Sequence, residues 1–173
     1  MTPLETHLSA GAALTTLDAC AAFGARGLLV CGHSLERTGR LERILNANRR
    51  AAVVRVWRHP GGEPTLGHLE LLLETARDHN PDWIAAIGGG SVLDIAKACA
   101  GLLDAPESVR AYHDGAPIPH SRRVFIAVPT TAGTGSEATS VSVLTNSDTG
   151  VKKSIRHPSF LARLVPVSYT HLR

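Results

Sequence analysis

The feature that most constrains the fold is a series of short, predominantly apolar runs separated by segments with helical spacing. The runs are Gly27–Cys31, Ala51–Trp57, Trp83–Ile87 and Val124–Val128, with a possible fifth at Val141–Leu144. Consecutive apolar positions indicate strands that are buried on both faces, as in parallel sheets covered by helices. The sequence therefore predicts an α/β fold, a Rossmann-like parallel sheet with helices on both faces.

Two of the intervening segments carry clear helical periodicity, since their apolar residues recur every three or four positions. The first stripe consists of Leu66, Leu69, Leu72, Leu73 and Ala76, and the second of Val92, Ile95, Ala96, Cys99 and Leu103. We expect the first helix to end at Asn80-Pro81, because proline cannot continue a helix.

Length and composition agree with an ordinary globular domain, or one large lobe of a bigger protein. The chain has 173 residues, 43% of them hydrophobic and 19% charged, which excludes a disordered protein. No apolar run approaches the roughly 20 residues needed to cross a bilayer, and the first residues do not resemble a secretion signal. We therefore expect a cytoplasmic protein with no membrane partner. A net charge of +3 with seven aromatic residues also argues against a nucleic-acid partner.

The first candidate site is a glycine turn between a predicted strand and a predicted helix. Gly88, Gly89 and Gly90 precede Ser91 at the carboxyl end of Trp83–Ile87, where ligands of parallel sheets bind. Three residues without Cβ atoms let backbone amides approach an anion closely, and the helix N-terminus adds partial positive charge. This pattern favours phosphate binding.

The alternative is a purely structural turn, in which Ser91 caps the helix and Asp94 completes a capping box. Capping explains those two residues well, but it leaves at least one of the three glycines unexplained. Asp94 and Lys97 lie three positions apart on one helix face. Their spacing fits a surface ion pair and a ligand contact equally well.

The second candidate site is the segment Pro129–Ala138, which follows the strand Val124–Val128. Gly133–Ala138 formally matches the dinucleotide pattern G-x-G-x-x-A, which is weak evidence alone. Its hydroxyl side chains are more informative, because a ribose or phosphate site needs many neutral hydrogen-bonding groups. They belong to Thr130, Thr131, Thr134 and Ser136. A polar surface loop is the alternative.

The two segments together resemble the cofactor-binding signatures of the iron-containing (group III, metal-dependent) alcohol dehydrogenases. The similarity rests on Gly88–Lys97 and Pro129–Glu137, about forty residues apart, and extends over roughly residues 10–165. Glu63-Pro64-Thr65 and Lys152–Ile155 resemble further landmarks of that family. The resemblance implies a dehydroquinate-synthase-like fold, with an N-terminal NAD(P)-binding domain and a C-terminal helical domain that carries most metal ligands.

The resemblance also implies an activity and a set of binding residues. The activity is reversible hydride transfer between NAD(P) and an alcohol, aldehyde or ketone, with a divalent metal, Fe or Zn, in the intact protein. Gly88, Gly89, Gly90 and Ser91 would hold the pyrophosphate, and Asp94 and Lys97 would face the nicotinamide end. The remaining predicted contacts are Thr130, Thr131 and Thr134 along the cofactor cleft and Lys152 at the nicotinamide ribose.

The end of the first predicted strand bears on the choice between NAD and NADP. Where members of the family that prefer NAD have an acidic residue, this chain has Gly32, His33 and Ser34, with Arg37 close behind. The missing carboxylate removes repulsion against a 2′-phosphate. We therefore expect Gly32 and Ser34 to contact the cofactor and NADP to be tolerated or preferred.

The C-terminal residues depart from the family pattern. We expect residues 1–165 to form the NAD(P)-binding domain and residues 166–173 to be an atypical tail, similar to a frame error or a cloning scar. The tail lacks the family's Asp-Pro metal motif, and no histidine pair has helical ligand spacing. We therefore predict no metal site and no catalytic residue in this chain, which alone would be inactive.

Two other functions fit the same residues less well. One is a nucleotide-binding module that performs no chemistry, and the other is a sugar-phosphate lyase on the same fold. The sequence identifies neither the substrate nor the oligomeric state, although a homo-oligomer is possible.

Overall fold

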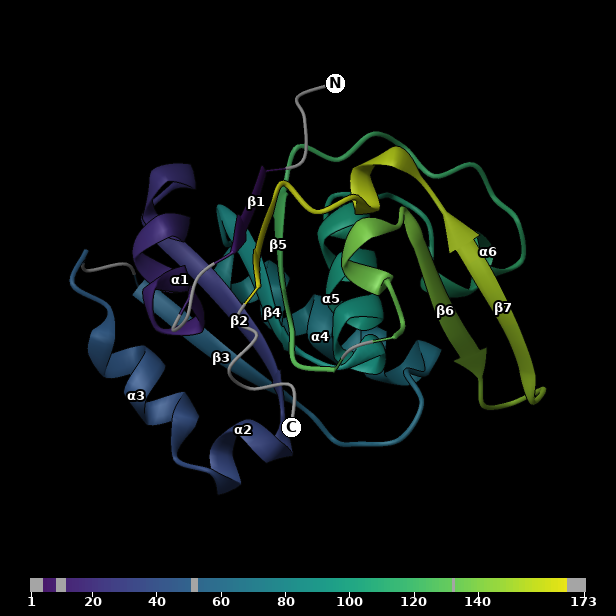
Figure 1. Cartoon of the computed structure of the whole chain (residues 1–173). Helices are drawn as coiled ribbons and strands as arrows, with labels where there is room; N and C mark the ends of the chain where they lie inside the picture. Colours follow the sequence, from purple (N-terminus) through teal and green to yellow (C-terminus); the bar gives the residue numbers. More distant parts are fainter. Residues whose placement is uncertain (1–4, 9–11, 51–52, 132, 168–173) are drawn as a thin grey trace.

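A six-stranded parallel sheet forms the centre of the computed structural model, which describes residues 5–8, 12–50, 53–131 and 133–167 (Figure 1). The strand order is β1-β8-β5-β4-β2-β3. The strands are β1 (Glu5–Leu8), β2 (Arg26–Gly32), β3 (Val53–His59), β4 (Trp83–Gly88), β5 (Val124–Pro129) and β8 (Leu164–Val167). The predicted strands at 27–31, 83–87 and 124–128 are confirmed. The described part of 51–57 is also a strand, but its expected burial is wrong, because β3 lies at the edge of the sheet and most of its residues are exposed or half-buried.

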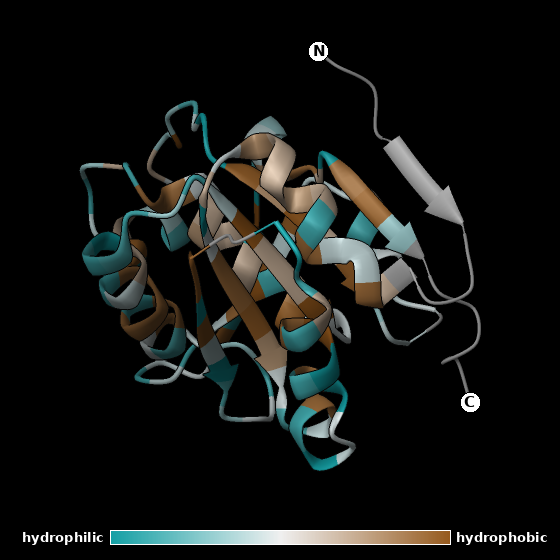
Figure 2. Cartoon of the chain, turned by 90° about the vertical axis from the view of Figure 1, so that its left-hand side faces the viewer, coloured by the Kyte–Doolittle hydropathy of each residue, from teal (hydrophilic) through white to brown (hydrophobic). Residues whose placement is uncertain are grey.

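Helices cover both faces of the sheet, as predicted (Figure 1). Alternate residues of β4 show this directly, because Ile84 and Ala86 belong to one apolar core whereas Trp83 and Ala85 belong to the other. The first core contains α4 (Leu66–His79), α5 (Gly90–Leu102) and α6 (Val109–His113). The second contains α1 (Ala12–Cys20), α2 (His33–Arg37) and α3 (Arg40–Ala47). Hydrophobic strands run between the two layers in Figure 2.

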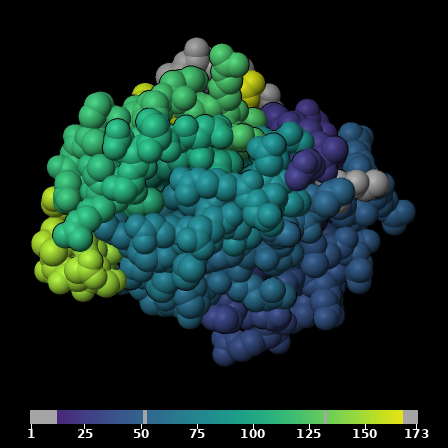
Figure 3. All heavy atoms as spheres, turned by 180° about the vertical axis from the view of Figure 1, so that it is seen from behind, coloured from purple at the N-terminus to yellow at the C-terminus, as the bar shows by residue number. Residues whose placement is uncertain are grey.

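The two predicted helices begin and end for identifiable reasons. The hydroxyl of Thr65 caps α4 by accepting a 3.1 Å hydrogen bond from the amide of His68. Asn80 closes the helix with left-handed backbone (φ 48°), and its amide bonds the carbonyl of Ala76. The apolar stripe of α5 is completely covered, since this helix packs between the sheet and other elements. Seen from behind, atoms from the middle of the chain, coloured teal and blue-green, form one continuous surface (Figure 3).

The expected fifth strand exists, but its place in the sheet was predicted wrongly. β6 (Val141–Asn146) pairs with β7 (Val151–Arg156) as an antiparallel hairpin outside the parallel sheet. Alternate residues of β6 are buried, so only one of its faces contacts the core. The hairpin lies beside α5 at one end of the molecule (Figure 1).

The strand β8 returns the chain to the sheet between β1 and β5. It pairs Pro166 with His7 and Val167 with Leu8. The domain boundary expected after residue 165 therefore falls inside a strand, and residues 168–173 lie outside the described residues. Within the part of the chain that the structure describes there are also three short 3-10 helices, η1 (Ala21–Phe23), η2 (Ser136–Ala138) and η3 (Pro158–Phe160).

Candidate cofactor site

The first glycine turn connects β4 directly to α5. Gly88 ends the strand, Gly89 is the N-cap residue, and the helix begins at Gly90. No side chain caps this helix, so the structural alternative, a capping box of Ser91 and Asp94, is not formed. The first amides of a helix have no acceptor within it, and in α5 they follow backbone without side chains. This arrangement suits an anionic group.

Packing explains part of the glycine requirement. A Cβ atom on Gly88 would lie 2.6 Å from Cβ of Val92, which no relaxed structure tolerates. On Gly89 it would lie 3.3 Å from the hydroxyl of Thr131, and on Gly90 it would lie 3.1 Å from a methyl of Thr134. The first glycine is therefore structural, whereas the other two keep a narrow space open between the two loops.

The second turn lies beside the first, because β4 and β5 are neighbours and Gly88 pairs with Pro129. Thr131, Gly133 and Thr134 are exposed in the loop that follows. Gly133 and Gly135 have φ values of 118° and 61°, which favour glycine. The predicted hydroxyl groups thus lie next to the predicted phosphate turn, while Ala132 lies outside the described residues.

Asp94 and Lys97 do not form a surface pair, because the Lys97 side chain is completely buried. Its ammonium donates to the carbonyl oxygens of Ser136, Thr139 and Val141, at 2.5, 3.1 and 3.0 Å. It lies 3.6 Å from the Asp94 carboxylate. Burial lowers the pKa of Lys97, and the nearby carboxylates of Asp94 and Glu137 oppose this shift.

The remaining predicted contacts lie further along the same edge of the sheet. Gly32 ends β2, and its Cβ position would be 3.5 Å from a methyl of Val92 at the start of α5. Ser34 and Arg37 are exposed on α2. Glu36, the carboxylate nearest in sequence, is bonded to Arg58 at 3.1 Å. The corner next to β2 therefore presents hydroxyl and basic groups.

Lys152 lies on β7, where it is bonded to Glu63 rather than to either turn. Its ammonium is 2.6 Å from the Glu63 carboxylate, which also accepts a 3.1 Å bond from the Thr145 hydroxyl. Lys152 and Thr145 lower the pKa of Glu63. Glu63 and Lys152 come from the two segments that resemble family landmarks. The contact between them could not be predicted, because the two segments are far apart in the sequence.

Among the described residues, no three His, Cys, Asp or Glu side chains cluster closely enough to hold a metal ion. His113 and His120, seven positions apart, do not converge: His113 is buried against the carbonyl of Leu144, and His120 contacts Ser159. The described residues also contain no helix that is long and apolar enough to cross a membrane.

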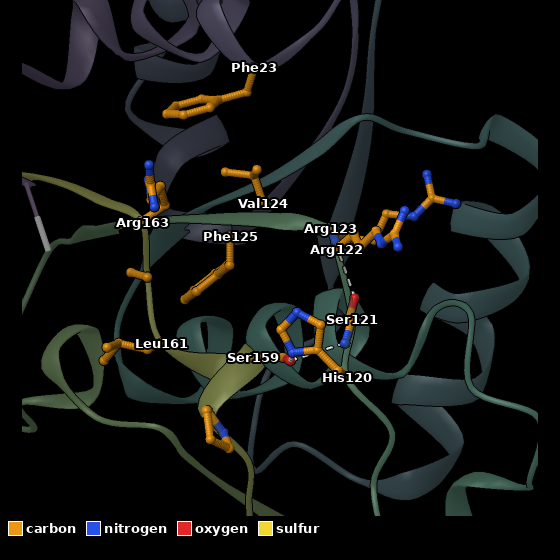
Figure 4. Close-up of a pocket in the computed structure, with 12 residues that line it drawn as sticks. Phe23, His120, Ser121, Arg122, Arg123, Val124, Phe125, Ser159, Leu161 and Arg163 are labelled. Atoms are coloured by element: carbon orange, nitrogen blue, oxygen red, sulfur yellow. Dashed lines mark hydrogen bonds between the residues drawn. The ribbon is translucent and has the colours of Figure 1, made fainter. Parts of the chain in front are cut away.

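A separate pocket of about 580 Å³ opens at the opposite edge of the sheet, where β5 begins (Figure 4). Its floor includes Val124 and Phe125, and Ser121 and Ser159 are hydrogen-bonded at one side. Arg123 is held by both carboxylate oxygens of Asp104, each at 2.8 Å. Because it opens where β5 begins, the pocket is remote from the glycine turns and does not belong to the same site.

Comparison with known proteins shows which proteins the chain is similar to. A family model described as "Iron-containing alcohol dehydrogenase" matches residues 3–168. The "Probable alcohol dehydrogenase EutG" of Escherichia coli K12 is 36% identical over 129 residues, which are 75% of this chain and 32% of that protein. The "NADPH-dependent butanol dehydrogenase" of Clostridium saccharobutylicum is 33% identical over 75% of this chain and 34% of its own length.

Solved structures agree with the fold over nearly the whole chain. Sulfoacetaldehyde reductase from Bifidobacterium kashiwanohense, in complex with NAD+, superposes with a TM-score of 0.89 at 31% identity. An iron-containing alcohol dehydrogenase from Thermococcus thioreducens gives a TM-score of 0.86 at 27% identity. Each match covers 97% of this chain but only 45% and 46% of the other chain. The chain thus spans about a third of these curated relatives and under half of these structures.

Proposed function

The chain belongs to the iron-containing alcohol dehydrogenase family, and on that premise we propose that it supplies the NAD(P) site of such an enzyme. The proposed reaction is reversible hydride transfer between the cofactor and an alcohol, aldehyde or ketone. The nicotinamide carries the hydride when the cofactor is bound. The residues of this chain bind and orient it.

The observation that carries this proposal is the position of two glycine turns at the carboxyl ends of adjacent parallel strands. Gly88 and Pro129 are register partners, so the turns that follow them open at one point of the sheet edge. Dinucleotides bind at such edges, with the diphosphate on a helix N-terminus. The helix that begins at Gly90 has no side-chain cap to compete for this place.

Within this site the residues divide by chemistry. Backbone amides at Gly89, Gly90 and Ser91 would hold the diphosphate. The hydroxyls of Thr130, Thr131 and Thr134 would bond the ribose or phosphate oxygens. Lys152, which also carries a hydrogen bond to Glu63, would reach the ribose next to the nicotinamide by exchanging that partner.

We also propose that NADP binds more tightly than NAD. Support comes from the corner after β2, where His33, Ser34 and Arg37 are exposed and Glu36 is engaged by Arg58. A 2′-phosphate would meet hydroxyl and basic groups there, without a free carboxylate to repel it. The relative from Clostridium is named for NADPH and the structure from Bifidobacterium holds NAD+, so both cofactors occur among similar proteins.

The metal of the proposed enzyme is not assigned to this chain, because the described residues supply no donor cluster. In the whole protein its ligands would come from elsewhere, and we derive no step through it. The substrate pocket is likewise not assigned to this chain.

Titration of the purified chain with NADP and NAD by calorimetry tests the proposal. We expect saturable binding of both cofactors and no aldehyde reduction at an ordinary enzymatic rate. Binding of neither cofactor would contradict the cofactor site. Ordinary turnover by the 173-residue chain would instead contradict the assignment of the metal and substrate sites to another part of the protein.

A further inference from the structure

Asp94 and Lys97 make their contacts with one continuous segment, residues 136–143. Besides the carbonyls already described, Lys97 donates a 3.4 Å bond to the hydroxyl of Thr139. The two carboxylate oxygens of Asp94 accept from the Ser136 hydroxyl at 2.5 Å and from the Val143 amide at 3.0 Å. The Asp94 carbonyl accepts a 2.9 Å bond from the Ser142 hydroxyl. Both side chains thus bind α5 to the segment between the second glycine turn and β6.

These contacts leave the Lys97 ammonium with no access to a ligand. The side chain is fully buried, and its oxygen partners surround the nitrogen. Burying an ammonium group is costly unless it is paired and hydrogen-bonded. The buried Lys97 ammonium, one helical turn after the glycine turn, therefore fixes the position of the segment that it binds.

The other end of the hydroxyl-bearing loop is fixed separately, by a 3.0 Å bond from the Thr130 amide to the Gly88 carbonyl. The described residues between these two anchors are Thr131, Gly133, Thr134 and Gly135, and both glycines have positive φ. Glycine-rich backbone loses much conformational entropy when it is ordered. Without its second anchor, this stretch would have little to hold it against Gly89 and Gly90.

We propose that Asp94 and Lys97 are positioning residues, which anchor residues 136–143 on α5 and so hold Thr131 and Thr134 beside the glycine turn. The inference rests on the proposed cofactor site. It gives the two charged residues a role in preorganising that site rather than in touching the cofactor. Preorganised loops bind ligands more tightly because less conformational entropy is lost on binding.

Amide hydrogen exchange in the cofactor-free chain tests the anchoring itself. In the variant Lys97→Met, we expect exchange in residues 134–143 to accelerate at least about tenfold. Asp94→Ala should expose the Val143 amide in particular, because it removes its acceptor. If Lys97→Met does not fold, Ser136→Ala removes only the hydroxyl bonded to Asp94, and Ser136→Thr should restore it.

Cofactor titration of the same variants tests the consequence. We expect the dissociation constant for NADP to rise roughly tenfold in Lys97→Met, with a smaller rise in Ser136→Ala. Asp104→Ala is the matched control. It breaks an ion pair just beyond the other end of α5, with Arg123, and should leave both loop exchange and NADP affinity unchanged.

Three outcomes separate this proposal from its alternatives. Weaker NADP binding by Lys97→Met with unchanged loop exchange would overturn it, since Lys97 would then act on the cofactor directly. Unchanged exchange and unchanged affinity would also overturn it. If the unmodified chain binds neither cofactor but the loop exchanges faster in Lys97→Met, the proposed function fails while the anchoring is supported.

Discussion

The amide of Thr130 donates a 3.0 Å hydrogen bond to the carbonyl of Gly88, across the ends of two adjacent strands. This bond joins two turns that are about forty residues apart in the chain. It places backbone without side chains on one side of a narrow space and threonine hydroxyls on the other. This combination suits diphosphate and ribose groups, so the pair of turns, rather than either one alone, defines the candidate site.

The most direct mutational prediction concerns Gly90. In Gly90→Val the new Cβ would lie 3.1 Å from a Thr134 methyl, and the branched side chain would fill the space proposed for the cofactor. We expect the dissociation constant for NADP to rise by about a hundredfold or more, with the fold retained. Gly67→Ala, on the exposed side of α4, is the control and should bind normally. Unimpaired binding by Gly90→Val would contradict a role for Gly90 in cofactor binding.

A second prediction concerns cofactor choice. Ser34→Asp restores a carboxylate to the corner after β2, where it would repel a 2′-phosphate and could bond ribose hydroxyls. We expect the ratio of NADP to NAD affinity to fall by roughly tenfold or more. Calorimetric titration with both cofactors measures the ratio. Clearly tighter NAD binding by the unmodified chain would contradict the assignment.

A third prediction separates two glycines that sequence alone treats alike. Alanine usually stabilises a helix relative to glycine, by about 1 kcal/mol. Gly67→Ala should follow this rule, whereas a Cβ on Gly101 would lie 2.1 Å from the buried ring of Phe160. We expect Gly101→Ala to lower the free energy of unfolding by roughly 1–3 kcal/mol. Urea denaturation of both variants measures the difference, and equal effects would be inconsistent with the packing of η3 on α5.

A fourth prediction concerns pH. Burial lowers the pKa of His59 from 6.5 to about 4, with smaller contributions from His68 and His33. Between these two values the unfolded chain binds a proton at this position that the folded chain does not. The free energy of unfolding should therefore fall as the pH drops through this window.

Thermal unfolding at about pH 7 and about pH 5 measures this effect. The loss of stability should be smaller in His59→Gln, which has no such proton to bind. An equal loss in the His59 variant and the unmodified chain would exclude His59 as its source.

The central sheet could be predicted because β2, β4 and β5 are covered on both faces, which forces continuous apolar runs. β6 could not be placed by the same rule, since its one-sided burial is that of a hairpin strand. The four-residue strands β1 and β8 are too short to carry a pattern. The location of Gly88–Ser91 and Thr130–Thr134 at the carboxyl ends of the strands was predictable, because each segment follows a predicted strand.

The charged residues show what the sequence could not reveal. The spacing of Asp94 and Lys97 fits an exposed pair, yet their partners lie about forty positions away, at Ser136–Val143. Lys152 and Glu63, which form an ion pair across 89 positions of the sequence, are a second example. Such partners depend on tertiary packing, whereas periodicity reports only local structure.

An amide NMR titration of the chain with NADP locates the bound diphosphate directly. We expect the largest shift changes at the amides of Gly89, Gly90 and Ser91, with smaller ones at Thr131 and Thr134. Saturable binding that leaves these amides unshifted would contradict the proposed cofactor site, because the diphosphate would then be held elsewhere.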